Sequence, residues 1–326
     1  MTYTAYFDSG TTNSRLYLLD GQDEIVTTAR CEVGAKDSAK ARNGEVQTRA
    51  LYGLYTEVLK KEGLADSDVK RICISGNVTA RYGVHEVPHG VLPLDAQAFS
   101  RLLFTFKEDK YFRREISLVP GVKQLNEDFA LTGLARGEEI ELFGMADTLL
   151  GLCGKETAAV VMPGSHTHVA FMQGDRIAGL CSNMTGEIFH ALKKDTVLAP
   201  VLEEAGGLQD EWIRKGLAAL EEFGITRALY MAHTMRILET YEPAERRSFA
   251  EGVIFGGIVR STAYFTEKLF PDCRRMLIAA DGEVGQLYQT LFAARPGFAD
   301  ISLLPAGKEP WALQGYKKLF SQEKRS

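Results

Sequence analysis

Two stretches of this chain, about 150 residues apart, share one order of predicted elements, and this repeat constrains the fold more than any other feature. In the first stretch, residues 3–7 and 15–19 suit strands on either side of a small polar turn, residues 9–13. Asp20-Gly21 is a hairpin signal that precedes a third strand, residues 25–31.

The second stretch repeats this order with nearly the same spacing. Residues 159–162 and 168–173 suit strands around a polar turn at 163–167, and Gly174-Asp175 precedes a third strand at 176–182. A single copy is a weak signal, whereas two copies predict two like-folded domains that face one cleft.

The segments after the first stretch continue a sheet through a helix. Residues 45–62 place apolar side chains on one helical face, Gly63 ends that helix, and residues 71–75 suit a short strand. This order of elements is a ribonuclease-H-like opening. The sequence therefore predicts two α/β domains, over residues 1–155 and 156–326.

Periodicity and composition assign the other segments. Residues 34–44 are expected to form a polar loop, residues 95–106 a helix, and the basic tail from Lys317 a frayed helix. The glutamates at 138 and 139 suit the first turn of a helix that runs to residue 152. Further helices are expected at 208–223, 226–240, 243–270 and 285–294, and further strands at 116–119, 274–280 and 301–304.

The composition excludes several classes of protein. With 326 residues, 45% hydrophobic and 25% charged, the chain is long enough for two domains with substantial cores. A net charge of -5 gives no electrostatic footprint for nucleic acid. No apolar run approaches the roughly 18 residues of a transmembrane helix, and Asp8 precedes any core of a secretory signal. Five scattered cysteines without a CxxC pair indicate reduced thiols in a cytosolic protein.

The first turn has the residue types that a nucleotide's phosphate tail needs. Asp8 ends a predicted buried strand, and the turn after it contains Gly10, Thr11, Thr12 and Asn13. The N–H groups and hydroxyls of such a turn donate to phosphate oxygens, glycine permits close approach, and the carboxylate holds Mg²⁺ or its waters. The other interpretation is an ordinary hairpin rich in turn residues. These residues are the candidate phosphate site, with Asp8 as the candidate metal ligand.

The second turn is the matching candidate, with Gly164, Ser165, His166 and Thr167. His166 and His168 alternate along the chain, but no Cys or carboxylate stands at the spacing of a third zinc ligand. His166 is therefore expected to donate to a phosphate.

A third glycine turn lies near the end of the chain. Asp281 and Gly282 separate the strand expected at 274–280 from a helix. A strand–glycine turn–helix unit presents helix N–H groups to a nucleotide. We therefore add both residues to the candidate nucleotide site.

Several segments, in their order and spacing, together resemble the 2-dehydro-3-deoxygalactonokinase family. They are Asp8-Ser-Gly-Thr-Thr-Asn-Ser-Arg15, Val119-Pro-Gly121, Arg136-Gly-Glu-Glu139, Met162-Pro-Gly-Ser-His166, Met184-Thr-Gly-Glu187 and the glycine-containing helix near Gly252. The Met-Pro-Gly-Ser-His and Met-Thr-Gly-Glu segments are the more specific part, because the Asp8 segment alone indicates only the superfamily of acetate kinase, sugar kinases, Hsp70 and actin. The resemblance extends from Asp8 to about Gln289.

The resemblance implies two ribonuclease-H-like (actin-like ATPase) domains around a nucleotide cleft. It also implies a cytoplasmic kinase of galactonate catabolism, which uses ATP and Mg²⁺ to phosphorylate the 6-hydroxyl of 2-dehydro-3-deoxy-D-galactonate or a closely related 2-keto-3-deoxy sugar acid. The implied partner is this small anionic substrate, with neither nucleic acid nor membrane, and a homodimer is left open.

The resemblance also implies catalytic roles. In the superfamily a carboxylate precedes the helix that leads to the second phosphate turn, and Glu138 and Glu139 stand at that place. Either is the candidate general base, with Glu138 slightly favoured, and the other would cap the helix or face solvent. Arg136 beside them is expected to bind the acid's carboxylate or to neutralise charge.

The expected substrate contacts come from three other places in the first half of the chain. Arg15 is expected to reach a phosphate or the substrate carboxylate in bidentate fashion, and a surface ion pair is the other interpretation. Gly76, Asn77 and Lys123 are expected to line the substrate wall.

Three segments depart from the usual family pattern. Ile140-Glu141 stand where the family usually has Thr-Gln, and residues 77–83 are less rich in Gly and Ser. Asp281-Gly282-Glu283 replace a turn that is usually rich in hydroxyls. The first two departures concern the substrate, and the third concerns contacts at the base end of the nucleotide.

Two further functions remain open from the sequence. A kinase of the same fold that acts on another small polyol or keto-acid would share all of these motifs and would differ at the substrate wall. A non-catalytic actin-like nucleotide-binding scaffold would not need the pair Glu138 and Glu139.

Overall fold

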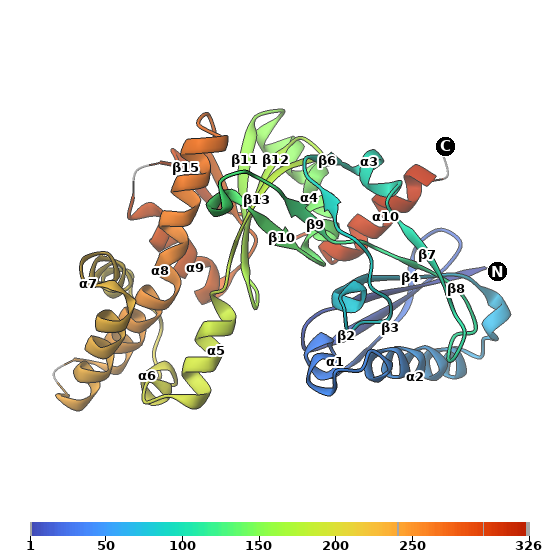
Figure 1. Ribbon diagram of the computed structural model, residues 1–326, viewed down its shortest axis with the longest axis horizontal. Helices are drawn as coiled ribbons and strands as arrows, with labels where there is room; N and C mark the ends of the chain where they lie inside the picture. The colour runs from blue at the N-terminus through green and yellow to red at the C-terminus, as the bar shows by residue number, and fades with distance from the viewer. Residues whose placement is uncertain (1, 240, 296, 324–326) are drawn as a thin grey trace. The chain divides into compact units, whose positions relative to one another are not determined.

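The computed structural model describes residues 2–239, 241–295 and 297–323 (Figure 1). Its chain divides into two compact units. The first unit contains the chain up to Leu150, residues Asp175–Ala178 and the segment from Gly307 onward, and the second contains Gly151–Gly174 and Gly179–Ala306. The segment from Gly307 therefore groups with the N-terminal part of the chain, whereas the sequence-based division assigns it to the second domain.

The first unit is built around one mixed sheet. Its strand order is β3-β2-β1-β4-β8-β7, in which β1 pairs antiparallel with β2 and parallel with β4. A second, smaller sheet has the order β10-β9-β5. The strands of the unit are β1 (Tyr3–Ser9), β2 (Ser14–Leu19), β3 (Ile25–Cys31), β4 (Val69–Gly76), β5 (Gly90–Val91), β6 (Leu94–Asp95), β7 (Phe104–Glu108), β8 (Arg114–Leu118), β9 (Val122–Gln124) and β10 (Gly133–Ala135). The helices are α1 (Ala35–Ala41), α2 (Glu45–Glu62), α3 (Ala96–Ser100), α4 (Glu138–Cys153), which begins in this unit, and α10 (Trp311–Glu323).

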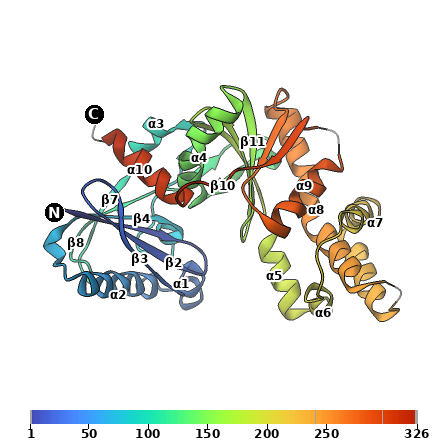
Figure 2. The same cartoon turned by 180° about the vertical axis from the view of Figure 1, so that it is seen from behind.

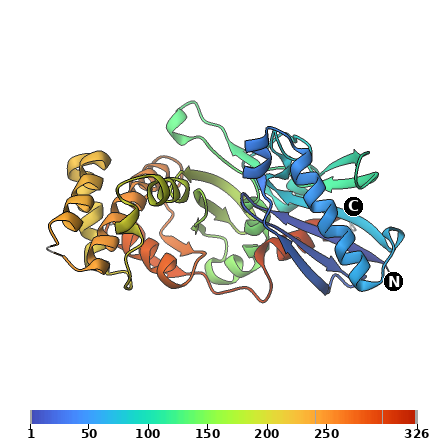
Figure 3. The ribbon, with the colours of Figure 1, turned by 90° about the horizontal axis from the view of Figure 1, so that it is seen from below.

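Two helices cover the two faces of the main sheet (Figure 1). Alternate residues of β1 point to opposite faces, so Phe7 packs with Leu51 of α2 in the core, while Tyr6 stacks on Tyr316 of α10 at 4.7 Å between ring centroids. Figure 3 shows α2 lying across the strands on its own side. Asp8 shares the face of Tyr6, since it stands two residues further along β1.

The second unit repeats the sheet of the first. In the strand order β15-β14-β11-β12-β13-β6, the first five strands place an antiparallel three-strand meander beside parallel strands, as in β3-β2-β1-β4-β8, and β6 pairs with Arg176 and Ile177 at the start of β13. The repeat predicted from the sequence is confirmed by this common order. The elements are β11 (Thr157–Met162), β12 (Thr167–Gln173), β13 (Arg176–Asn183), α5 (Gly186–Asp195), α6 (Ala199–Leu202), α7 (Asp210–Ile237), α8 (Pro243–Leu269), β14 (Arg275–Ile278), α9 (Gly282–Ala293) and β15 (Asp300–Leu303).

The long helices α7 and α8 lie side by side in the second unit (Figure 2). Gly252 permits this approach, because a Cβ there would lie 2.3 Å from the carbonyl oxygen of Ile213. Gly224 breaks α7 with non-helical angles, as expected for separate helices over 208–223 and 226–240. The end of the second expected helix, Thr240, lies outside the described residues.

Three expectations about the first unit were wrong. Residues 34–44 contain α1, whose start is capped by Asp37 accepting the N–H of Gly34 at 3.0 Å. The helix expected over 95–106 stops at Ser100, because Phe104 and Phe106 pair with β8 in β7. The tail is not frayed at Lys317, since buried apolar side chains of α10 pack into the unit. They are Leu313, Tyr316, Leu319 and Phe320.

None of the five cysteines forms a disulfide. Within the described part of the chain, no helix combines the length and the apolar character needed to cross a membrane.

Candidate active site

The first turn, residues 9–13, is held by hydrogen bonds from the start of α1. Gly10 donates its N–H to the carbonyl of Asn13 at 2.9 Å and closes the turn. Ala35 and Lys36 donate their N–H groups to the carbonyls of Gly10 and Thr11 at 3.1 and 3.0 Å. A Cβ on Gly34 would lie 2.4 Å from the Thr11 carbonyl oxygen, so a glycine is needed there. The helix start thus fixes the carbonyls of the turn.

A buried hydroxyl and amide network supports the same turn. Ser9 and Ser14 share a hydrogen bond of 2.6 Å, and Gln47 donates its Nε2 to Ser9 Oγ at 2.8 Å. Gln47 Oε1 is buried and has no partner among the described residues. Sequence reasoning missed this residue, because a glutamine inside a helix carries no motif signal.

Asp8 lies at the end of β1 with charged neighbours of both signs. It pairs in register with Arg15, so their side chains lie on one face of the sheet. Burial raises the pKa of Asp8, Arg15 lowers it, and Glu138 raises it again. A cation at this point would relieve the repulsion between the carboxylates of Asp8 and Glu138.

Glu141 is a further carboxylate at this place that sequence reasoning did not assign to the site. Burial raises its pKa to about 8, and the charges of Asp8 and Glu138 contribute to that rise. Its spacing of three residues from Glu138 on α4 could have identified it, because such residues share a helix face.

The two candidate bases differ in burial. Glu139 is fully buried, its Oε2 accepts the Gly137 N–H at 2.7 Å, and its Oε1 has no partner among the described residues. Burial holds the pKa of Glu139 well above its ordinary value, and the nearby charge of Glu138 raises it further. Glu138 is partly exposed, and its Oε2 accepts the N–H of Arg136 at 3.1 Å.

Gly76 and Asn77 lie next to the first turn. Gly76 has φ 90°, and a Cβ there would lie 2.2 Å from the Ser9 carbonyl oxygen. Asn77 donates its Nδ2 to Thr11 Oγ1 at 3.4 Å. The end of β4 therefore meets the phosphate turn through two of the residues predicted to bind substrate.

Arg136 and Lys123 surround a histidine that the sequence did not single out. Arg136 contacts Thr79 Oγ1, donates to the carbonyl of Val87 at 3.1 Å, and lies 3.0 Å from a ring nitrogen of His89. Burial, Arg136 and Lys123 lower the pKa of His89 to about 4. The imidazole is thus neutral at physiological pH and accepts from the guanidinium, and the surroundings favour an anion.

The second turn, residues 163–167, is supported by the start of α5. A Cβ on Gly186 would lie 2.2 Å from the Gly164 carbonyl oxygen, and Glu187 donates its N–H to the Ser165 carbonyl at 2.7 Å. His166 is exposed, and its Nε2 lies 3.1 Å from Glu187 Oε2. Gly164, Ser165 and His166 are therefore accessible at one place.

Thr167 does not share that accessibility. Its buried hydroxyl bonds to the hydroxyls of Thr185 at 2.6 Å and Tyr288 at 2.5 Å. The side chain of Thr167 ties β12 to α9 beneath the turn. His168 is also buried, with its Nδ1 3.0 Å from Ser182 Oγ.

Asp281 and Gly282 begin α9. Asp281 is the N-cap residue, and its side chain makes no capping hydrogen bond. Gly282 has φ 55°, which favours glycine. Both residues are exposed, and the next residue, Glu283, accepts from Arg247 at 2.7 Å. The start of α9 is therefore exposed, and nucleotide binding by Asp281 and Gly282 stays a prediction.

The residues at the first turn could bind Mg²⁺ through one carboxylate together with waters and phosphate oxygens. Among the residues that the structure describes, no group of three His, Cys, Asp or Glu side chains is placed to hold a metal ion by itself. Mg²⁺ commonly keeps several waters and takes one or two carboxylates together with phosphate oxygens. Asp8 at the edge of a phosphate-type turn suits that manner of binding.

Comparison with known proteins agrees with these observations. The sequence matches the 2-keto-3-deoxy-galactonokinase family over residues 8–302. A curated protein of Rhizobium meliloti (strain 1021), named as a probable 2-dehydro-3-deoxygalactonokinase, is 25% identical over 298 residues, which is 88% of each chain. The crystal structure of a proposed 2-dehydro-3-deoxygalactonokinase from Sinorhizobium meliloti superposes with a TM-score of 0.74 at 21% identity over 99% of each chain. The predicted fold, with two ribonuclease-H-like units, is confirmed.

Proposed function

The chain belongs to the 2-keto-3-deoxy-galactonokinase family, and we propose that it transfers the γ-phosphoryl group of ATP to the 6-hydroxyl of 2-dehydro-3-deoxy-D-galactonate or a closely related sugar acid. Family membership makes it a kinase, a phosphotransferase that acts on an alcohol group of a sugar acid. The observation that carries the finer proposal is the gathering of Asp8, Arg15 and Glu138 beside a phosphate-type turn.

The first turn would bind the phosphates. The N–H groups of Ala35 and Lys36 hold the carbonyls of Gly10 and Thr11, and the hydroxyls and remaining backbone N–H groups of the turn would donate to phosphate oxygens. Asp8 would hold Mg²⁺ through its waters, and the metal when bound supplies positive charge to the transferring phosphoryl group. Gly164, Ser165 and His166, with Asp281 and Gly282, would contact the nucleotide from the second unit.

Glu138 would act as the general base that accepts the proton of the sugar hydroxyl. It is partly exposed and lies close enough to Asp8 to affect that residue's pKa. Glu139 is poorly placed to act as the base, because it is fully buried and its Oε2 already accepts the N–H of Gly137. In this proposal Glu139 holds the start of α4 and Glu138 does the chemistry.

The cations of the first unit support the proposal that the substrate is an anion. Arg15 is exposed on the face that carries Asp8, and Lys123 and Arg136 create the positive surroundings of His89. A bidentate guanidinium contact suits a carboxylate. We assign Arg15 and Lys123 as carboxylate ligands, because Arg136 already contacts Thr79, Val87 and His89.

A coupled assay of ADP release tests this function. Purified protein is offered MgATP with a panel of 2-keto-3-deoxy sugar acids, aldonic acids and neutral sugars. We expect turnover of a 2-keto-3-deoxy acid and loss of turnover when Mg²⁺ is chelated. Equal turnover of neutral sugars would contradict the carboxylate contacts, and turnover of another polyol or keto-acid alone would support a kinase of different specificity.

A homodimer stays a prediction from the sequence. Sedimentation equilibrium on the purified protein would measure the oligomeric state, and a monomer over the accessible concentration range would contradict it.

A further inference from the structure

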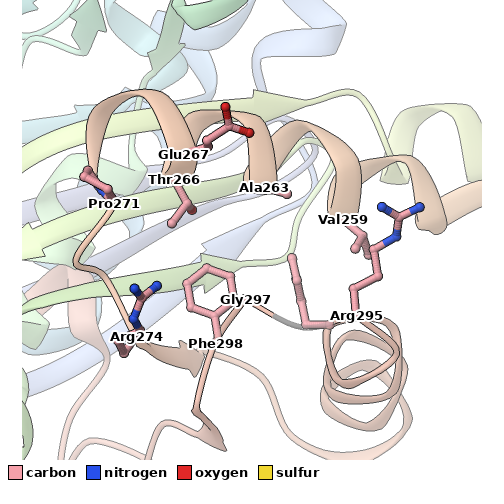
Figure 4. A pocket seen from close by; sticks show the side chains of 10 residues that line it. Val259, Ala263, Thr266, Glu267, Pro271, Arg274, Arg295, Gly297 and Phe298 are labelled. Atoms are coloured by element: carbon pink, nitrogen blue, oxygen red, sulfur yellow. The ribbon is translucent and has the colours of Figure 1, made fainter.

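The second unit contains a cavity of about 350 Å³ between the last turns of α8, the end of α9 and the segment before β14. Figure 4 shows Val259, Ala263 and Thr266 on successive turns of α8, with Arg274 and Phe298 on the other side of the cavity. Its volume lies in the range of small-molecule sites. The residues assigned to phosphoryl transfer do not line it.

The wall of the cavity is mainly apolar. Val259 and Phe292 are buried at its base, Phe298 is half-buried, and Pro271 closes one side. Phe292 and Phe298 meet edge to face, with ring centroids 6.4 Å apart. Aromatic and aliphatic walls of this kind bury the apolar body of a ligand.

The charged groups at the cavity differ in their partners. Arg295 pairs with Glu221, and Glu267 contacts Lys268 at 3.0 Å. Arg274 has no carboxylate partner among the described residues, although its backbone carbonyl accepts the N–H groups of Ala299 and Asp300. The cavity therefore offers one uncompensated cation beside an apolar space.

We propose that this cavity binds a small monocarboxylate whose apolar body is about the size of a six-membered ring. Phe292, Phe298 and Val259 bury the body, and the guanidinium of Arg274 receives the carboxylate. A planar guanidinium matches a carboxylate with two parallel N–H···O bonds, and this geometry favours a carboxylate over a neutral amide of the same shape.

The cavity and the nucleotide segment of the second unit lie at opposite ends of the same elements. Arg274 precedes β14, whereas Asp281 follows it. Helix α9 begins at Gly282 and reaches the cavity through Phe292, about 15 Å along its axis at 1.5 Å per residue. Binding of this ligand is therefore independent of the proposed function, and failure of either proposal leaves the other standing.

Phenylacetate and phenylacetamide serve as charged and neutral probes, with binding followed by saturation-transfer NMR on the full chain. We expect phenylacetate to bind at least about tenfold more tightly than phenylacetamide, since a hydrogen bond to a charged group contributes about 1.5–3 kcal/mol. Arg274→Gln should remove that preference. Ala263→Phe should fill the cavity and abolish the binding of both probes.

Arg260→Gln is the matched control, because Arg260 is an exposed arginine of α8 that does not line the cavity. It should bind phenylacetate as the wild type does, and saturating MgATP should not displace the probe. Circular dichroism verifies that each variant is folded, and Arg274→Gln tests the proposal if Ala263→Phe does not fold. Absence of phenylacetate binding to the wild type, binding unchanged by Arg274→Gln, or displacement by MgATP would overturn the proposal.

Discussion

The two phosphate-type turns have the same support but different chemistry. In each, a glycine at or just before the start of a helix lies so close to a carbonyl of the turn that a Cβ would not fit. Gly34 approaches the carbonyl of Thr11 in the first unit, and Gly186 approaches that of Gly164 in the second. The strand residues that stand two positions before the turn glycines Gly10 and Gly164 differ, since they are Asp8 in the first unit and Met162 in the second.

The strands that follow the two turns also differ, because the first carries an exposed charged side chain and the second a buried histidine. Arg15 pairs with Asp8 and is exposed, whereas His168 pairs with Met162 and is buried against Ser182. The backbone architecture is thus shared, and the ionic chemistry depends on the side chains at the strand ends. We infer that the first unit carries the reaction and that the second unit contributes binding.

The largest effect should come from removing the charge that distinguishes the turns. Asp8→Asn should lower kcat by at least about a hundredfold, since the charge stabilisation that a bound metal supplies is worth several kcal/mol. Met162→Leu, at the corresponding strand end, should leave kcat near the wild-type value. A coupled ADP-release assay measures kcat for both variants. Similar losses of kcat in the two variants would contradict the inference that the first unit carries the reaction.

Substitution of the two glutamates at the start of α4 should change kcat by very different amounts. Glu138→Gln should lose about 10²–10⁴ in kcat, as is typical when a general base is removed. Glu139→Gln changes a buried side chain whose contact with the Gly137 N–H an amide oxygen can replace, so it should keep kcat and ATP affinity. If Glu139→Gln alone loses activity, the roles must be exchanged, and if neither does, the base lies elsewhere.

Because a glycine at a helix start contacts each turn, substitution of either glycine should lower the free energy of unfolding by a similar amount. Gly34→Ala and Gly186→Ala should each lower the free energy of unfolding by about 1–3 kcal/mol, because the new Cβ overlaps a turn carbonyl. Gly53→Ala and Gly257→Ala, at open helix positions of the two units, should instead stabilise by about 0.5–1 kcal/mol. Thermal unfolding measures the stability of the four variants. If only one of Gly34→Ala and Gly186→Ala lowered the stability, the two turns would not be supported in the same way.

The smallest effect concerns pH and the first unit. The pKa of His89 is about 4 in the folded chain and about 6.5 when unfolded, so only the unfolded state takes up a proton between those values. The stability that neutral His89 contributes is complete above pH 6.5 and is lost as the pH falls toward 4. His89→Gln should weaken this loss between pH 7 and pH 5 in urea unfolding. His190→Gln, at an exposed position of α5, is the matched control, and equal changes in the two variants would contradict the role of His89.

Most of the fold could be predicted because the repeat and the helical periodicity are local patterns. The helix α2 was predicted with its observed bounds, since Gly63 ends it in a left-handed conformation with φ 66°. Segment 95–106 could not be predicted, because Phe104 and Phe106 become strand residues only when β8 is beside them. Periodicity within a short segment cannot reveal a partner that comes later in the chain.

The candidate site was predictable where a residue type and a turn coincide, as at Asp8, Gly10 and Gly164. Asp8 and Gly10 are partly exposed and Gly164 is exposed, and their binding of phosphate stays a prediction. His89 and Gln47 could not be identified, because their importance depends on Arg136 and Ser9, which reach them only in the folded chain. The burial that separates Glu138 from Glu139 is likewise a tertiary property.

The position of α10 has a consequence for biosynthesis. Tyr316 covers Tyr6, and a Cβ on Gly315 would overlap the Ile140 carbonyl, so this helix packs closely on elements that the ribosome makes first. Domains usually fold during translation from the N-terminus onward. Here one face of the sheet that contains β1 gains the cover of α10 only after residues 311–323 have been made. Until then Tyr6 lacks its stacking partner Tyr316, and a chain whose synthesis stops before residue 311 has the strands of this sheet without that helical cover.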